Sequence, residues 1–249
     1  MKSYTLKLYV LLVSIMLTSF TNAKEVYMAF SQEIPPYIFQ KLNRGIQIDI
    51  ISAALAYKGH TLKPLYFPLG RVPIAFKSKL VNAAMGDMGV NLTASGGFYA
   101  DPAVIYNNVF YTLKSKGLSI TKPSDLDSLR VVSFQGAEKW YPKWLNKVQE
   151  EKRFYGISDQ LTQVKLLYYE RYDVVLSDRY IFNYFVKELM LMSGLEIHEV
   201  DEHKFTTMNP EHFRPVFRDE QVRDDFNLGL KKIKENGKFQ KIYDKYIEL

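Results

Sequence analysis

The chain has 249 residues, with 33 Lys and Arg against 27 Asp and Glu and a formal net charge of +6. It contains no cysteine, which excludes disulfides, thiolate catalysis and cysteine metal sites. A charge this small favours no particular class of partner, and we expect no binding to nucleic acid.

The first segment, residues 1–23, has the pattern of a cleaved export signal. Lys2 and Lys7 precede a largely apolar stretch from Leu8 to Phe20, and small residues then lead to Ala23. This stretch is shorter than the roughly 20 residues that span a bilayer, so we expect cleavage after Ala23 rather than a membrane anchor. Since no cysteine is present to carry a lipid anchor, we predict release into the periplasm of a Gram-negative bacterium.

Residues 26–79 alternate between strand and helix patterns. Short apolar runs at 26–30 and 62–67 predict strands. Apolar residues at helical spacing predict helices over 45–57 and 71–79. This alternation is typical of a parallel sheet with helices on both faces.

Two stretches about ninety residues apart, 80–87 and 171–178, share one pattern. In each, a helix ends in charged residues, a turn carries Asn or Asp, and a short apolar run stops at an Asp, which is Asp87 or Asp178. Such a run is most simply a buried parallel strand, and ligands bind at the carboxyl ends of strands in open α/β sheets. We therefore predict two similar α/β lobes whose ligand-binding edges face each other across a cleft.

The remaining segments complete the predicted order. Residues 91–101, rich in Gly, Ser, Ala and Thr, predict a loop near the cleft. Residues 103–113 predict a strand that crosses to the second lobe, and 204–216 predict the return crossing. Residues 131–134 predict the first strand of the second lobe, and the amphipathic stretch 222–246 predicts a closing helical region.

Several of these motifs resemble the family 3 extracytoplasmic solute-binding proteins, which deliver amino acids and related small polar molecules to ABC importers. The motifs are Pro35-Pro36-Tyr37, the helix start Gly45-Ile46-Gln47-Ile48-Asp49, and the segments 125–132 and 226–239. The resemblance implies a periplasmic-binding-protein type II fold, in which two α/β lobes, each a mostly parallel sheet flanked by helices, are joined by two crossover strands that act as a hinge. We expect one discontinuous lobe of residues 24–106 and 206–249, and a second lobe of residues 107–205.

The resemblance also implies ligand roles for particular residues. Asp178 matches the position whose carboxylate holds a ligand's α-ammonium group, although Asp is also well suited to cap the helix that follows. Tyr37 matches a loop aromatic that stacks on a ligand side chain, with packing on the lobe surface as the alternative. Glu33 is either a further ligand contact or a solvated loop charge.

One departure from the family concerns the ligand's carboxylate. The amino-acid receptors carry an Arg shortly after a Thr, in a loop that corresponds to Thr93 onward, and this chain has no Arg there. A planar guanidinium is hard to replace in carboxylate recognition, so the departure weakens the expectation of an ordinary α-amino acid. Arg71 is a candidate substitute cation unless it forms a surface salt bridge, and Arg179 and Lys139 are weaker candidates.

Other candidate residues concern the polarity of the pocket. Gly136 and Ala137 begin a helix where the family usually has a hydroxyl, so only backbone N–H groups remain there for an anion. Asp87, with Asp178 and Glu33, would instead make an acidic pocket for a cationic amine, unless Asp87 only caps a turn. The aromatic residues in segments that could line the cleft are Phe98, Tyr99, Tyr106, Trp140 and Tyr141.

Together these features predict a periplasmic receptor that binds a small, polar, amine-bearing ligand, an amino acid or a related solute, and delivers it to the membrane permease of an ABC importer. One alternative is a sensory protein that reports the ligand to a membrane signalling partner. Another is a cleft enzyme of the cyclohexadienyl dehydratase type. The four histidines show no paired metal-ligand spacing, so we expect no metal. We also expect no cofactor and no enzymatic activity, and we expect the protein to be a monomer.

Overall fold

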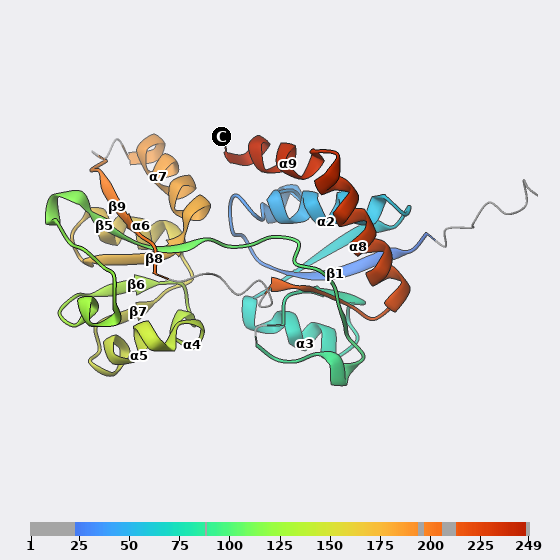
Figure 1. The fold of residues 1–249 in the computed structure, drawn as a ribbon, viewed down its shortest axis with the longest axis horizontal. Coiled ribbons are helices and arrows are strands. Elements are labelled where there is room, and N and C mark those ends of the chain that lie inside the picture. The colour runs from blue at the N-terminus through green and yellow to red at the C-terminus, as the bar shows by residue number, and fades with distance from the viewer. Residues whose placement is uncertain (1–22, 88, 194–196, 206–212, 248–249) are drawn as a thin grey trace, which may run out of the picture.

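The computed structural model describes residues 23–87, 89–193, 197–205 and 213–247. The ribbon forms two lobes, each built on one five-stranded sheet (Figure 1). The apolar core of the predicted export signal, Leu8 to Phe20, lies outside the described residues. Among the helices of the described ranges, none is long and apolar enough to cross a membrane.

The first sheet combines strands from both ends of the chain. Its spatial order is β2 (Thr61–Phe67), β1 (Glu25–Ser31), β3 (Ala83–Met85), β10 (Pro215–Phe217) and β4 (Phe98–Tyr99). β1 pairs in parallel with β2 and β3, whereas β10 pairs antiparallel with β3 and β4. The chain therefore returns to the first sheet after it has built the second.

The second sheet repeats this arrangement. Its spatial order is β7 (Phe154–Gly156), β6 (Val131–Ser133), β8 (Val174–Asp178), β5 (Asn108–Leu113) and β9 (Val200–His203). β6 pairs in parallel with β7 and β8, and β5 pairs antiparallel with β8 and β9. β3 and β8, which end the two copies of the sequence repeat, thus hold equivalent places in the two sheets, and the predicted pair of similar α/β lobes is confirmed.

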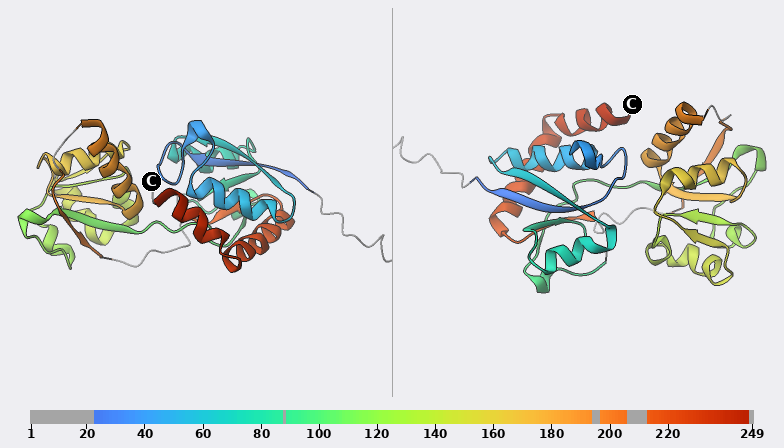
Figure 2. Two further views of the ribbon diagram at one scale, coloured as in Figure 1. Left: turned by 90° about the horizontal axis from the view of Figure 1, so that it is seen from above. Right: turned by 180° about the vertical axis from the view of Figure 1, so that it is seen from behind.

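Helices cover both faces of the first sheet. They are α2 (Ile46–Ala56), α3 (Val72–Lys77), α8 (Glu220–Glu235) and α9 (Lys238–Ile247). Side chains alternate along β1, so Met28 and Phe30 pack in the core under α2 and α8, whereas Ala29 packs in the core under α3. The ribbon shows α2 and α8 on one side of the sheet and α3 on the other (Figure 2).

Close packing joins α2 and α8 in the first lobe. A Cβ atom added at Gly229 of α8 would lie 2.0 Å from the carbonyl oxygen of Ala54 in α2. Only a glycine permits this approach, and the helices bury Ile50, Phe226 and Leu230 in the same core.

The second sheet is flanked by α4 (Ala137–Trp140), α5 (Pro142–Glu150), α6 (Gln160–Tyr168) and α7 (Arg179–Ser193). Short 3-10 turns complete the described elements: η1 (Gln40–Leu42), η2 (Leu69–Arg71), η3 (Thr93–Ser95), η4 (Lys114–Lys116) and η5 (Pro123–Leu126). The strand predicted over 103–113 begins only at Asn108, because its partner strand β8 ends at Asp178, which pairs with Asn108. Ala103, Val104 and Tyr106 pack into the core of the first lobe without a strand partner in the described sheets. The predicted return crossing, 204–216, lies partly outside the described residues and ends in β10.

Candidate ligand site between the lobes

A pocket lies where the central strands of both sheets end. Ser31 ends β1, Met85 ends β3, and Phe134 follows β6, and all three line this pocket. Asp178, the last residue of β8, also lines it. The predicted ligand-binding edges of the two sheets therefore contribute to one pocket.

Asp178 is 2 % exposed and lies between β8 and α7. Its Oδ1 accepts hydrogen bonds from the backbone N–H groups of Tyr180 and Ile181, at 2.9 and 3.1 Å. Its Oδ2 accepts from the backbone N–H of Asn107 at 2.6 Å and from the hydroxyl of Tyr37 at 3.3 Å. Burial raises the pKa of Asp178 to about 6, although these hydrogen bonds oppose the rise. The residue caps α7 and also presents a carboxyl group to the pocket.

Tyr37 reaches Asp178 from the loop that follows β1. The conformation of this loop depends on Gly45, whose φ is +134° and where a Cβ would lie 2.3 Å from the carbonyl oxygen of Tyr37. The N–H groups of Ile46 and Gln47 donate to the carbonyl oxygens of Pro36 and Tyr37, at 3.0 and 3.1 Å. The start of α2 thus holds the loop, and with it the Tyr37 hydroxyl, in place.

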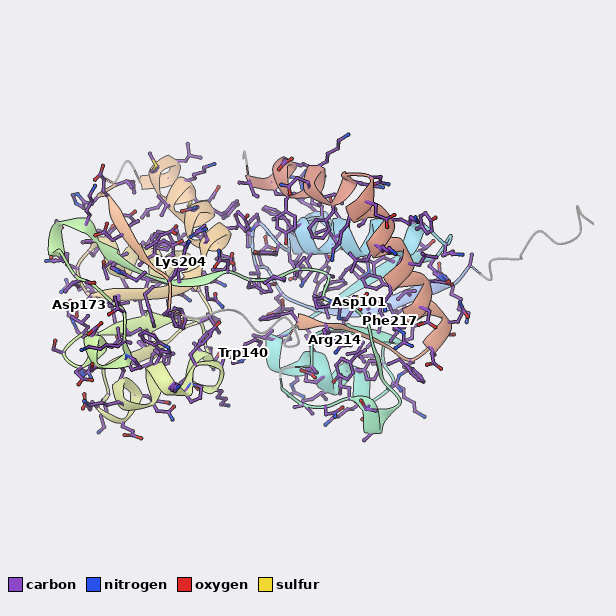
Figure 3. All side chains as sticks on the ribbon, in the orientation of Figure 1. Asp101, Trp140, Asp173, Lys204, Arg214 and Phe217 are labelled. Carbon is purple, nitrogen blue, oxygen red and sulfur yellow. The ribbon has the colours of Figure 1, made fainter. Side chains whose placement is uncertain are left out.

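Four aromatic rings form a row beside the carboxyl group of Asp178. The ring centroids are 4.4 Å apart for Tyr37 and Tyr106, 4.6 Å for Tyr106 and Phe213, and 4.8 Å for Phe213 and Trp140. Tyr106 and Phe213 lie in the two segments that connect the sheets, and Trp140 lies in α4 of the second lobe. Figure 3 shows Trp140 on the side of its lobe that faces Arg214 in the other lobe. The row therefore runs from Tyr37, fully buried at one end, to Trp140 in the other lobe.

The rest of the pocket lining is uncharged. Its polar members are Ser31 and the carboxamides of Gln47, Asn108, Gln135 and Gln160. Its apolar members include Ile34, Leu69, Met85 and Ile181. The amide of Gln47 is hydrogen-bonded to the Tyr106 hydroxyl, and that of Asn108 donates to the Tyr141 hydroxyl at 2.8 Å. The pocket combines one carboxyl group with carboxamides and an apolar, aromatic wall.

Two of the predicted acidic residues lie outside this lining. Asp87 accepts hydrogen bonds from the backbone N–H of Gly89 at 2.9 Å and from the hydroxyl of Tyr99 at 2.6 Å. Glu33 is exposed and accepts from the backbone N–H of Gln40 at 2.8 Å. Both carboxylates are engaged in local turns, so the structure does not bring them together with Asp178.

The candidate cations also lie outside the lining. Arg71 is exposed at the start of α3, and Lys139 is exposed on α4. Arg179 forms an ion pair with Glu202, in which its Nε lies 3.1 Å from Oε1.

The remaining predicted ligand-binding residues are Gly136 and Ala137, through their backbone N–H groups, and Thr93. Gly136, with a φ of +87°, and Ala137 start α4 directly after Gln135, which lines the pocket. Thr93 is exposed at the start of η3. Across the described ranges, no group of three or more His, Asp and Glu side chains is placed to hold a metal ion.

Several lining residues were not among the predicted site residues. Gln47 lies between two isoleucines in the first turn of α2, and Asn108 begins a strand that continues with Val109, Phe110 and Tyr111. A carboxamide inside an apolar run is the sequence signal that could have identified both. Gln160 and Phe213 carry no such signal, because each reaches the pocket only through the packing of its lobe.

Neither a protein-family model nor a curated protein matches the sequence, but solved structures do. An amino acid ABC transporter substrate-binding protein from Streptococcus pneumoniae, bound to L-arginine, gives a TM-score of 0.68 at 15% identity over 90% of this chain and 94% of that chain. A histidine kinase sensor domain similar to periplasmic binding proteins gives 0.68 at 17% over 89% and 95%. An ancestral amino-acid-binding protein, a precursor of cyclohexadienyl dehydratase, gives 0.67 at 17% over 90% and 95%. The chain has the two-lobed α/β fold of the periplasmic binding proteins, as its motifs predicted.

Proposed function

We propose that the protein is an extracytoplasmic receptor that binds a small, polar, amine-bearing solute, an amino acid or a related molecule, between its lobes. The observation that carries this proposal is the buried carboxyl group of Asp178 in a pocket lined from both sheets. A ligand ammonium beside Asp178 would gain a charge-assisted hydrogen bond, worth roughly 1.5 to 3 kcal/mol.

The proposed mechanism uses the two lobes in sequence. The solute docks on one lobe, and Asp178 with backbone groups of the other lobe completes its hydrogen bonds as the hinge closes. The closed form is then recognised by the permease of an ABC importer. We propose lobes of residues 24–106 with 206–249 and of residues 107–205, which exchange between open and closed arrangements.

The proposal extends to the cellular setting. We propose cleavage after Ala23 and release of a monomer, without a lipid anchor or cofactor, into the periplasm of a Gram-negative bacterium. The amino-acid-binding neighbours of the same fold support the class of ligand.

A second candidate function is sensing, which the histidine kinase sensor domain of the same fold favours. In that case the closed receptor would report the solute to a membrane signalling partner. The two functions predict different membrane partners for the solute-loaded protein. Capture of an importer permease on it would support transport, and capture of a membrane signalling protein would support sensing.

The first test is the melting temperature of the mature protein, refolded to remove any bound solute, against amino acids, polyamines, small peptides and dicarboxylates. A solute at about 100 times its Kd adds roughly 2.7 kcal/mol to the free energy of unfolding. A rise with amines or basic amino acids supports the proposal. A rise with dicarboxylates alone would contradict it and favour the dehydratase alternative, and silence from every solute would also contradict it.

A further inference from the structure

The described lining of the pocket between the lobes contains a carboxyl group suited to an amine but no cationic side chain suited to a carboxylate. Asp178 is the one Asp, Glu, Lys, Arg or His residue in the described lining. No Lys, Arg or His belongs to that lining. An ammonium therefore meets a carboxylate here, whereas a carboxylate would meet only neutral groups and the like charge of Asp178.

The three internal segments that lie outside the described ranges contain no strong cation. Residue 88 is Met, residues 194–196 are Gly-Leu-Glu, and residues 206–212 are Thr-Thr-Met-Asn-Pro-Glu-His. None of these segments contains Lys or Arg. Lys and Arg are therefore absent from these internal segments as well as from the described lining.

Arg214 and Arg179, which follow the lining residues Phe213 and Asp178 in the sequence, are committed to other groups. Arg71 and Lys139, close to Leu69 and Trp140 in the sequence, are exposed and lie outside the lining. The Nε of Arg214 donates to the carbonyl oxygen of Ala100 at 2.7 Å, and its guanidinium carbon lies 5.5 Å from the ring centroid of Tyr99. The guanidinium of Arg179 is paired with Glu202. Moving either one to a ligand would break contacts that the fold already makes.

A bound carboxylate is costly without such a partner. Transfer of an ionised carboxylate from water into a site that offers no cation leaves its charge uncompensated, and the neighbouring carboxylate of Asp178 adds repulsion. Carboxamides supply only neutral N–H donors, and those of Gln47 and Asn108 already serve the hydroxyls of Tyr106 and Tyr141.

From these contacts we infer that the solute of this site is an amine that lacks a free carboxylate, with an apolar or aromatic body. The inference rests on the proposed receptor function and narrows it. The ammonium lies beside Asp178, and the body packs against Trp140, Phe213 and Phe134, whose ring faces also attract a cation. The carboxamides of Gln135 and Gln160 in the same lining offer neutral hydrogen-bonding groups to the solute.

The test uses matched pairs of solutes that differ only in the carboxylate. Calorimetric titration of the mature protein compares phenethylamine with phenylalanine, tyramine with tyrosine, and isoamylamine with leucine. We expect at least one amine to bind, and to bind at least tenfold more tightly than its parent amino acid. In the variant Arg214→Gln, which keeps N–H donors for the Ala100 carbonyl, the affinity for that amine should change less than threefold.

The outcomes separate the inference from the function on which it rests. If an amino acid binds as tightly as its amine or more tightly, the inference is wrong but the receptor function stands. If Arg214→Gln then removes the binding of that amino acid, Arg214 is the carboxylate anchor that the inference denies. If no member of any pair binds, while the protein melts cooperatively, both the inference and the proposed amine receptor are wrong.

Discussion

The hydroxyl of Tyr37 and the carboxylate of Asp178 lie 3.3 Å apart, although 141 positions separate them in the sequence. Tyr37 follows β1 of the first sheet and Asp178 ends β8 of the second, so this hydrogen bond connects the two lobes. Its length is beyond the usual range for a hydroxyl donor, so the bond is weak. A ligand ammonium would take the place of the Tyr37 hydroxyl at Oδ2 at little cost.

Replacing Tyr37 with Phe tests this connection. The variant keeps the buried ring and removes only the donor, so the free energy of unfolding should fall by about 1 kcal/mol or less. Because the Tyr37 hydrogen bond lowers the pKa of Asp178, the pH at which amine binding is half lost should move upward. Denaturant unfolding and titrations at several pH values measure both effects.

The matched control is Tyr106→Phe, which removes a hydroxyl bonded to Gln47 rather than to Asp178. This variant should leave the pH midpoint of binding in place. Equal shifts in both variants would show that the Tyr37 hydroxyl has no specific effect on Asp178.

Solute binding should depend on pH through Asp178. Burial raises the pKa of this carboxyl group to about 6, so the group is increasingly protonated as the pH falls below that value. An amine solute stays cationic throughout this range, and its affinity should fall by up to about tenfold for each pH unit below about 6. Titrations between pH 4.5 and pH 8 measure the profile, and an affinity that is flat across this range would contradict the role of Asp178.

The contribution of Asp178 to folding stability should fall as the pH rises, whereas its contribution to solute affinity should increase. The pKa of Asp178 rises from 3.8 to about 6 in the folded protein, so the folded state binds more protons than the unfolded state between these values. The contribution of Asp178 to the free energy of unfolding is therefore fully present below about pH 4 and is lost as the pH rises through about 6. The difference in stability between the parent and Asp178→Asn should change in this window, and a constant difference would refute the assignment.

Trp140 should report solute binding by its fluorescence. The chain has two tryptophans; Trp140 lines the pocket, whereas the Trp144 ring packs on Phe110 and Phe205 in the second lobe. In Trp144→Phe, a binding solute should shift or quench the emission of Trp140. The converse variant, Trp140→Phe, should respond little, and a larger response from it would place the solute away from the aromatic row.

The contact between α2 and α8 should be sensitive to a single methyl group. In Gly229→Ala the new Cβ would meet the carbonyl oxygen of Ala54 at 2.0 Å, so the helices must separate. We expect a loss of about 1 to 3 kcal/mol in the free energy of unfolding. Gly70→Ala is the control, because a Cβ there meets no atom within 4 Å, and similar losses in the two variants would contradict the packing argument.

The sequence repeat predicted the two lobes because buried strands leave a strong apolar signal. The runs that lead to Asp87 and Asp178 became β3 and β8, which hold the same place in the two sheets. The chain order of the strands and the edge at which the pocket lies followed from the same pattern.

The direction of individual side chains could not be predicted in the same way. Asp87 and Asp178 follow similar apolar runs, but Asp87 bonds to Gly89 and Tyr99 while Asp178 lines the pocket. The strands end differently: β8 continues to Asp178, whereas β3 ends at Met85, and Gly86, with a φ of +87°, turns the chain before Asp87. The contribution of Phe213 depends on how β10 returns to the first sheet, which no local pattern encodes.

The most direct test of the account is a calorimetric titration of the parent protein and of Asp178→Asn with the amine that most raises the melting temperature of the parent. Asn retains a side-chain oxygen that can cap α7 but removes the negative charge. We predict that the variant remains folded and binds this amine at least tenfold more weakly. Equal affinity in the two folded proteins would contradict the claim that Asp178 holds the solute.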